Sequence, residues 1–238
     1  MSNVFTLVGK SWDFKKSQPV LRPVLFWLLF IPMSALLLME TYLETNQPSP
    51  DLIVGIGFLH IVVIALLLWG VACVTLVGKR LLKSKAGRAR SSFATVRKQA
   101  ARSVVNLFFT DILRGCITIL WSLLLIIPGI IYQIRTYFYF VAIVCEGKGY
   151  REALQHSKKT VKGQTWAALK GIVGLFFVIF IPLLVMDTVL TGALYTFEPK
   201  LLQATYLITA YLYSFGIVLL LLSSISLYAE LKRSSSKK

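Results

Sequence analysis

Six long apolar segments occupy most of this 238-residue chain, and they constrain its fold more than any other feature. An apolar helix of roughly 20 residues is long enough to cross the ~30 Å hydrocarbon core of a bilayer. No segment alternates with a period of two, so helices are expected and barrel strands are not. We expect an all-α, polytopic integral membrane protein with a single transmembrane domain, residues 1–238. Its six transmembrane helices should cover about 20–43, 52–78, 104–127, 130–145, 164–190 and 203–228.

The overall composition supports a membrane environment and argues against nucleic acid as a partner. Hydrophobic residues make up 56% of the chain, charged residues only 15%, and the mean hydropathy is +0.72. The net charge of +16 is large. A nucleic-acid interface would need these basic residues on one folded surface with base-stacking aromatics beside them. Here they lie between apolar segments, which is the pattern of the positive-inside rule. The sequence therefore predicts no nucleic-acid partner.

The distribution of basic residues also predicts the topology. The segment 79–103 carries nine Lys or Arg and no acid, whereas the loop 41–51 carries no basic residue and the loop 191–203 carries only Lys200. If 130–145 returns through the membrane, the basic segments and both termini fall on one side. We therefore expect six crossings in a bacterial inner membrane with both termini cytoplasmic. Pro128-Gly129 should end the third helix, and the short segment 130–145 should be tilted or partly re-entrant.

A basic segment precedes each of the three pairs of crossings. These segments are 3–16, 91–103 and 149–163, and each is compatible with a helix. A basic amphipathic helix can lie in the headgroup layer, where each Lys or Arg gains about 1 kcal/mol from anionic lipid. Anionic lipid headgroups are therefore the predicted partners, and the chain is interpreted as three units of a surface helix plus a hairpin. The alternative is that these are three ordinary basic loops.

One stretch, residues 126–166, carries a pattern that resembles a known family. A Pro-Gly-Ile follows an apolar helix, an arginine lies in the next helix, and a Gly-Lys-Gly turn leads into an Ala-Leu-x-x-Ser helix. The residues concerned are Pro128, Gly129, Ile130, Arg135, Glu146, Gly147, Lys148, Gly149, Ala153, Leu154 and Ser157. This pattern resembles the membrane domain attached to some bacterial glycerophosphoryl diester phosphodiesterases, and a wider group of uncharacterised stand-alone bacterial membrane proteins. The resemblance implies a six-helix membrane fold. It does not imply phosphodiesterase activity, because that activity resides in a separate catalytic barrel for which this chain has no room.

Ionisable residues within the apolar segments are the candidate functional residues, because charge inside a membrane is costly. Their structural interpretation is interhelical pairing or snorkelling to headgroups, and their functional interpretation is a polar pathway for a small solute or a lipid headgroup. Asp111 and Arg114 are three residues apart, so we expect them to pair on one helix. Arg135 and Asp187 lie at similar predicted depths near the outer surface, so we expect them to pair across helices. The full candidate set is Asp111, Arg114, Arg135, Lys170 and Asp187.

The sequence contains no pattern that predicts catalysis. Neither His60 nor His156 lies near a metal-binding motif or a paired carboxylate, so no metal and no cofactor are predicted. We expect a non-catalytic accessory or scaffold component of the inner membrane, for which another membrane protein is a further candidate partner. The alternative is a small transporter or lipid-handling protein that uses the intramembrane charges.

Overall fold

The computed structural model describes residues 3–46, 48–82, 92–197 and 202–235, and these residues are helical with short connections and no strand. The helices are α1 (Val4–Ser17), α2 (Leu21–Val24), the π-helical turn η1 (Leu25–Phe30), α3 (Ile31–Thr45), α4 (Pro50–Leu82), α5 (Phe93–Leu124), α6 (Ile126–Thr136), α7 (Tyr139–Glu146), α8 (Tyr150–Val161), α9 (Thr165–Phe197) and α10 (Leu202–Ser235). The predicted all-α polytopic membrane fold is confirmed.

Within the described residues, six stretches are long and apolar enough to cross a membrane, in agreement with the predicted number. They are Leu21–Thr45, Pro50–Leu82, Phe93–Leu124, Ile126–Glu146, Thr165–Leu194 and Thr205–Ser235. The third stretch begins earlier than predicted, because the basic segment 91–103 is not a separate surface helix. From Phe93 it is the first part of one continuous α5. The two other predicted surface helices, 3–16 and 149–163, form the separate helices α1 and α8.

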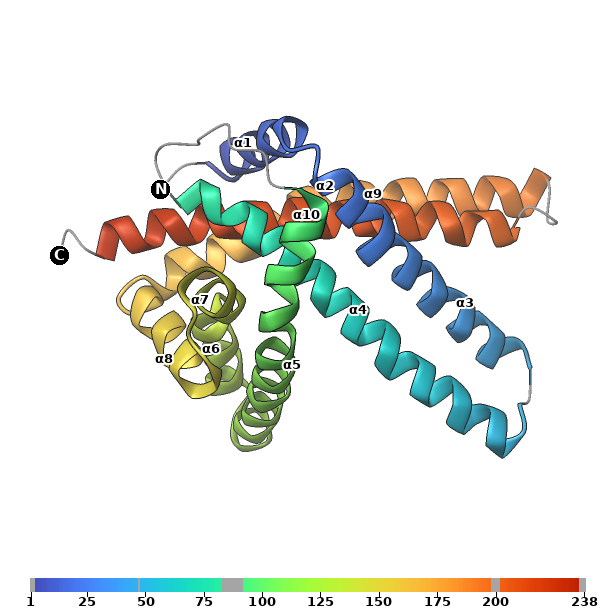
Figure 1. Cartoon of the computed structure of the whole chain (residues 1–238), viewed down its shortest axis with the longest axis horizontal. Coiled ribbons are helices and arrows are strands. Elements are labelled where there is room, and N and C mark those ends of the chain that lie inside the picture. The colour runs from blue at the N-terminus through green and yellow to red at the C-terminus, as the bar shows by residue number, and fades with distance from the viewer. Residues whose placement is uncertain (1–2, 47, 83–91, 198–201, 236–238) are drawn as a thin grey trace.

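Three antiparallel helix pairs, α3/α4, α5/α6 and α9/α10, diverge from a shared centre (Figure 1). Helix α10 runs through this centre, where it contacts α1, α3, α4, α8 and α9. Close approach there depends on small residues. A Cβ atom on Gly78 of α4 would lie 2.5 Å from Cδ1 of Ile225 on α10. Leu222 and Tyr228 on α10 are fully buried in the same core.

The turn between α5 and α6 differs from the prediction. Pro128-Gly129 was expected to end the third span, and this prediction is wrong. Leu125 alone interrupts the helices, with an extended backbone at φ −158° and ψ 129°. Pro128 then lies in the first turn of α6. Backbone N–H groups in the first turn have no acceptor within the helix, so a proline there costs no hydrogen bond. Gly129 faces α5, and a Cβ on it would lie 2.3 Å from Ser122 Oγ.

The fourth span is not one helix. It consists of α6 and α7, separated at Tyr137 and Phe138. Phe138 is fully buried, and α7 packs against α4, α5 and α8. This break turns the chain out of the hairpin and into the core, beside α8.

Candidate functional site

The corner where α6, α7 and α8 meet is held by Ser157. Its hydroxyl accepts a hydrogen bond from the backbone N–H of Phe138 at 3.2 Å and donates one to the carbonyl of Arg135 at 2.8 Å. Both backbone groups lie at the helix break, where regular helical partners are missing. Ser157 is fully buried. One side chain of α8 therefore fixes the geometry of the break and, with it, the position of Arg135.

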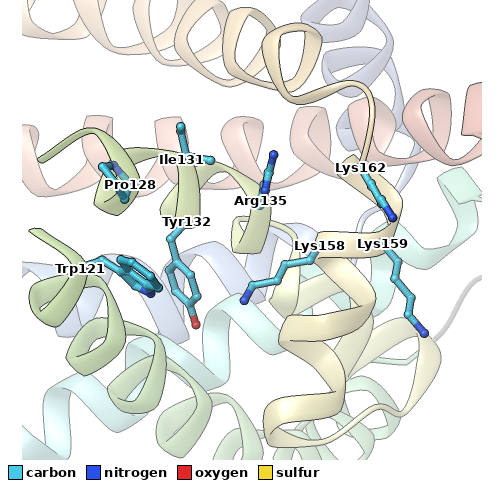
Figure 2. Close-up of a pocket in the computed structure, with 8 residues that line it drawn as sticks. All are labelled: Trp121, Pro128, Ile131, Tyr132, Arg135, Lys158, Lys159 and Lys162. Atoms are coloured by element: carbon cyan, nitrogen blue, oxygen red, sulfur yellow. The ribbon is translucent and has the colours of Figure 1, made fainter. Parts of the chain in front are cut away.

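Four basic side chains line a pocket of about 540 Å³ beside this corner (Figure 2). One comes from α6 and the others from α8 and the residue that follows it. Aromatic and apolar side chains of α5 and α6 form the opposite wall, and no acidic residue is among the lining residues. The lining residues are Trp121, Pro128, Ile131, Tyr132, Arg135, Lys158, Lys159 and Lys162.

Lys158 lies closest to the aromatic wall of this pocket. Figure 2 shows its side chain extended toward Tyr132, while Lys159 points the other way. The Lys158 ammonium is 4.4 Å from the centre of the Tyr132 ring, within the range of a cation–π contact. Partial burial lowers the pKa of Lys158, and the positive charge of Arg135 lowers it further. An anion bound between Lys158 and Arg135 would relieve this repulsion.

A second groove of about 640 Å³, lined by one charged residue where the first pocket has four, adjoins the basic pocket. Its walls are the isoleucines of α6 and the first turns of α9, including Trp166 and Leu169. The two cavities share Ile131 and Arg135. The basic pocket and the groove therefore meet at Arg135. A lipid combines a charged headgroup with an apolar acyl chain, and the two cavities match these two parts in the same order.

Arg135 is held at this junction by α9 and does not meet Asp187. Its Nε donates to Thr165 Oγ1 at 3.3 Å, at the beginning of α9. Asp187 lies about 22 residues further along the same helix, roughly 33 Å away at 1.5 Å per residue. The predicted Arg135–Asp187 pair is therefore wrong. Asp187 instead accepts a hydrogen bond from Thr209 on α10.

Asp111 and Arg114 pair locally, as the spacing predicted. Arg114 Nη1 is 3.7 Å from Asp111 Oδ1. Sequence reasoning missed two partners from the next helices: the Tyr139 hydroxyl donates to Asp111 at 2.8 Å, and Arg114 Nε donates to Thr136 Oγ1 at 3.2 Å. Nothing in the local spacing of these residues signals such contacts. The network ties α5 to both sides of the α6–α7 break.

The remaining candidate, Lys170, lies apart from this network. It lines a cavity of about 400 Å³ between α1 and α9, together with Asn3 and Leu7. The five candidate residues therefore do not converge on one pathway. Arg135 belongs to the basic pocket, Asp111 and Arg114 to the base of the α5–α6 pair, and Lys170 and Asp187 to separate parts of α9.

The remaining residues of the sequence pattern have capping or pairing roles. Gly147 has a left-handed φ of 71° and ends α7, and Gly149 is the N-cap of α8. Glu146 is bound by three groups that the sequence did not reveal. Its carboxylate is 3.0 Å from His156 Nε2 and 2.6 Å from Lys232 Nζ, and it accepts a 2.9 Å hydrogen bond from the Tyr228 hydroxyl.

Comparison with protein-family models, with curated proteins and with solved structures gives no match. What the site can do therefore follows from its own residues and geometry. Four basic side chains, one of them the half-buried Lys158 with its lowered pKa, lie beside a groove lined largely by apolar side chains, and this combination is chemically complementary to an amphiphilic anion.

Proposed function

We propose that this protein is a non-catalytic, multi-pass accessory protein of the bacterial cytoplasmic membrane that binds anionic phospholipid through the pocket at Arg135. The phosphate lies among Arg135, Lys158 and Lys162, and an acyl chain follows the groove between α6 and α9. The observation that carries this proposal is the meeting of the basic pocket and the apolar groove at Arg135.

The location of the basic residues supports the proposed orientation. The basic segment of α5, the basic face of α8 and Lys232 near the end of α10 all belong to the side predicted to be cytoplasmic. The inner surface of the membrane carries anionic lipid, which attracts Lys and Arg there. The proposed lipid therefore belongs to the cytoplasmic leaflet.

Lipid binding is favoured over solute transport because of where the other charges lie. A transport pathway requires polar groups that succeed one another across the membrane. Neither Lys170 nor Asp187 lines the basic pocket or the groove at Arg135: Lys170 lines a separate cavity between α1 and α9, and Asp187 is bound by Thr209. Lipid binding thus accounts for the geometry of the pocket at Arg135 without requiring a continuous row of polar groups across the membrane.

The proposal is tested by the effect of lipid on thermal unfolding of the purified protein in mild detergent. A ligand that binds only the folded state raises its stability. Phosphatidylglycerol should raise the Tm of the wild type more than phosphatidylcholine at the same mole fraction. Inorganic phosphate, which lacks the acyl chains, should have little effect. The double variant Arg135→Gln/Lys158→Gln should lose the preference for phosphatidylglycerol.

A matched control removes two charges from the same side of the protein. Lys98 and Arg102 are exposed residues of α5 that do not line the pocket. The variant Lys98→Gln/Arg102→Gln should keep the response to phosphatidylglycerol. Equal losses in both double variants would mean that lipid is attracted by diffuse charge, and no preference in the wild type would contradict the proposed function itself.

A further inference from the structure

The hairpin formed by α5 and α6 contains a long stretch without charge. From Gly115 to Ile134, about 20 residues, there is no Asp, Glu, Lys or Arg. The chain folds back at Leu125, near the middle of this stretch. Each uncharged arm is therefore about ten residues long, or roughly 15 Å at 1.5 Å per residue. That length is about half of the ~30 Å hydrocarbon core.

Charged residues lie together at the base of this hairpin. Arg114 ends the uncharged stretch on α5 and donates to Thr136 on α6, which directly follows Arg135. Arg135 reaches Thr165 and shares its pocket with Lys158. Asp111 and Tyr139 join the same layer through their hydrogen bond. The base is thus a polar layer continuous with the basic pocket.

The five residues at the turn of the hairpin are all apolar and exposed, and the nearest aromatic and polar side chains, Trp121 and Ser122, lie up to one helical turn back on α5. The side chains at the turn are 66–80% exposed, which makes them among the most exposed large hydrophobic residues of the protein: Leu123, Leu124, Leu125, Ile126 and Ile127. A turn that reached the aqueous interface would be expected to carry polar or aromatic residues.

The turn between α3 and α4, by contrast, carries polar and charged residues. Asn46, Ser49 and Asp51 lie at or beside it. The following arm, residues 52–78, is uncharged over about 27 residues, or roughly 40 Å, which is enough for a full crossing. In Figure 1 the ends of the α3/α4 and α5/α6 pairs also point in clearly different directions.

We propose that the α5–α6 hairpin is re-entrant: it enters the membrane from the side on which α8 lies and ends near the bilayer midplane. Its partner is the acyl-chain region of that one leaflet. If the hairpin crossed the membrane fully, Arg114 and Arg135 at its base would lie near the midplane, where charged side chains are most costly. Lys158, which shares a pocket with Arg135, would lie near the midplane too.

The irregular backbone of the turn is short, which limits its cost in an apolar environment. Unpaired backbone groups are costly in hydrocarbon, and here the irregular segment is a single residue. The Leu125 N–H donates to the Trp121 carbonyl at 2.9 Å, and its own carbonyl accepts from the Gly129 N–H at 3.5 Å. Pro128 has no N–H that requires a partner. Within the described part of the chain, no hydrogen bond across the turn pairs the carbonyls of residues 122–124 or the N–H groups of Ile126 and Ile127, a cost to set against the several charges that a full crossing would bury.

Single cysteines at the two turns distinguish a re-entrant hairpin from a full crossing. Cys116 is exposed and is first replaced by serine, whereas Cys73 and Cys145 are buried and stay. Leu125→Cys probes the α5–α6 turn, and Ser49→Cys the α3–α4 turn. Gln99→Cys probes exposed α5 outside the hairpin. A membrane-impermeant maleimide is applied to vesicles of both orientations. Position 49 should be labelled from one side, position 99 from the other, and position 125 from neither.

A spin label at position 125 tests what surrounds the turn. Frequent collisions with oxygen and rare collisions with a water-soluble nickel complex are expected for contact with acyl chains. Labelling of position 125 from the same side as position 49 would overturn the proposal in favour of a full crossing. Rare collisions with both reagents would overturn it in favour of contact with protein, such as a second copy of the chain. Leu124→Cys and Ile126→Cys, which are similarly exposed, repeat both measurements if the first variant folds poorly.

Discussion

At the scale of single residues, Ser157 is the side chain on which the site geometry depends most. It hydrogen-bonds to two backbone groups at the α6–α7 break and is fully buried. Ser157→Ala leaves the Phe138 N–H and the Arg135 carbonyl without this partner, and an unsatisfied buried group costs about 1–3 kcal/mol. We expect a loss of stability of that size.

Denaturant unfolding of the protein in detergent measures this loss. Replacement of the exposed Gln99 of α5 by alanine serves as the control and should change the stability by less than about 0.5 kcal/mol. Equal effects of the two substitutions would show that Ser157 does not hold the break. Because Arg135 is positioned through its own carbonyl, Ser157→Ala should also weaken the phosphatidylglycerol response.

Sequence spacing predicted residue contacts within one helix but not those between helices. The Asp111–Arg114 pair follows from a separation of three residues. The Arg135–Asp187 pair was inferred from counted depths, with 130–145 taken as a helix that starts at the outer surface. The break at Tyr137 and Phe138 turns the chain inward and brings Arg135 to the beginning of α9 instead. Depth counted along a chain fails where a span is broken.

At the scale of elements, close contact between α5 and α6 depends on Gly129. A Cβ at this position would lie 2.3 Å from Ser122 Oγ and 3.2 Å from the Ser122 Cα and N atoms. Gly129→Ala should therefore separate the two helices and cost about 1–3 kcal/mol, the usual range for overpacking. The additional change Ser122→Ala removes the closest atom and should restore part of the stability.

Gly115 provides the matched control for this prediction. It lies on α5, and a Cβ there would meet no atom within 4 Å. Gly115→Ala should be neutral or stabilising by up to about 1 kcal/mol, because alanine has the higher helix propensity. Thermal unfolding in detergent compares the variants. A Gly129→Ala protein as stable as Gly115→Ala would contradict the close contact between the helices.

The apolar segments predicted the number and approximate bounds of the helices because hydropathy and length determine both. They did not predict how α6 and α7 divide the fourth span. That division depends on Ser157 from α8 and on the burial of Phe138, contacts between segments that no local pattern contains. Pro128-Gly129 was interpreted as a helix end because proline and glycine commonly mark one, although proline is equally suited to the first turn of a helix.

At the scale of the whole molecule, three hairpins diverge from a core built around α10 (Figure 1). The basic pocket lies beside this core, at the base of the α5–α6 hairpin and next to the beginning of α9. The sequence predicted anionic headgroups as partners from the basic segments alone. It did not predict the pocket, because Arg135 and Lys158 come together only through the helix break.

The most direct test of lipid binding at this pocket uses Trp166, which lines the apolar groove. Phenylalanine replaces every other tryptophan in the reporter variant, so that position 121 keeps an aromatic side chain in the wall of the basic pocket, and phospholipids brominated on the acyl chain quench the remaining Trp166 fluorescence by contact. Brominated phosphatidylglycerol should quench Trp166 more strongly than brominated phosphatidylcholine at equal mole fraction, and Arg135→Gln/Lys158→Gln should abolish the difference. Equal quenching by the two lipids in the protein with an intact pocket would contradict the account.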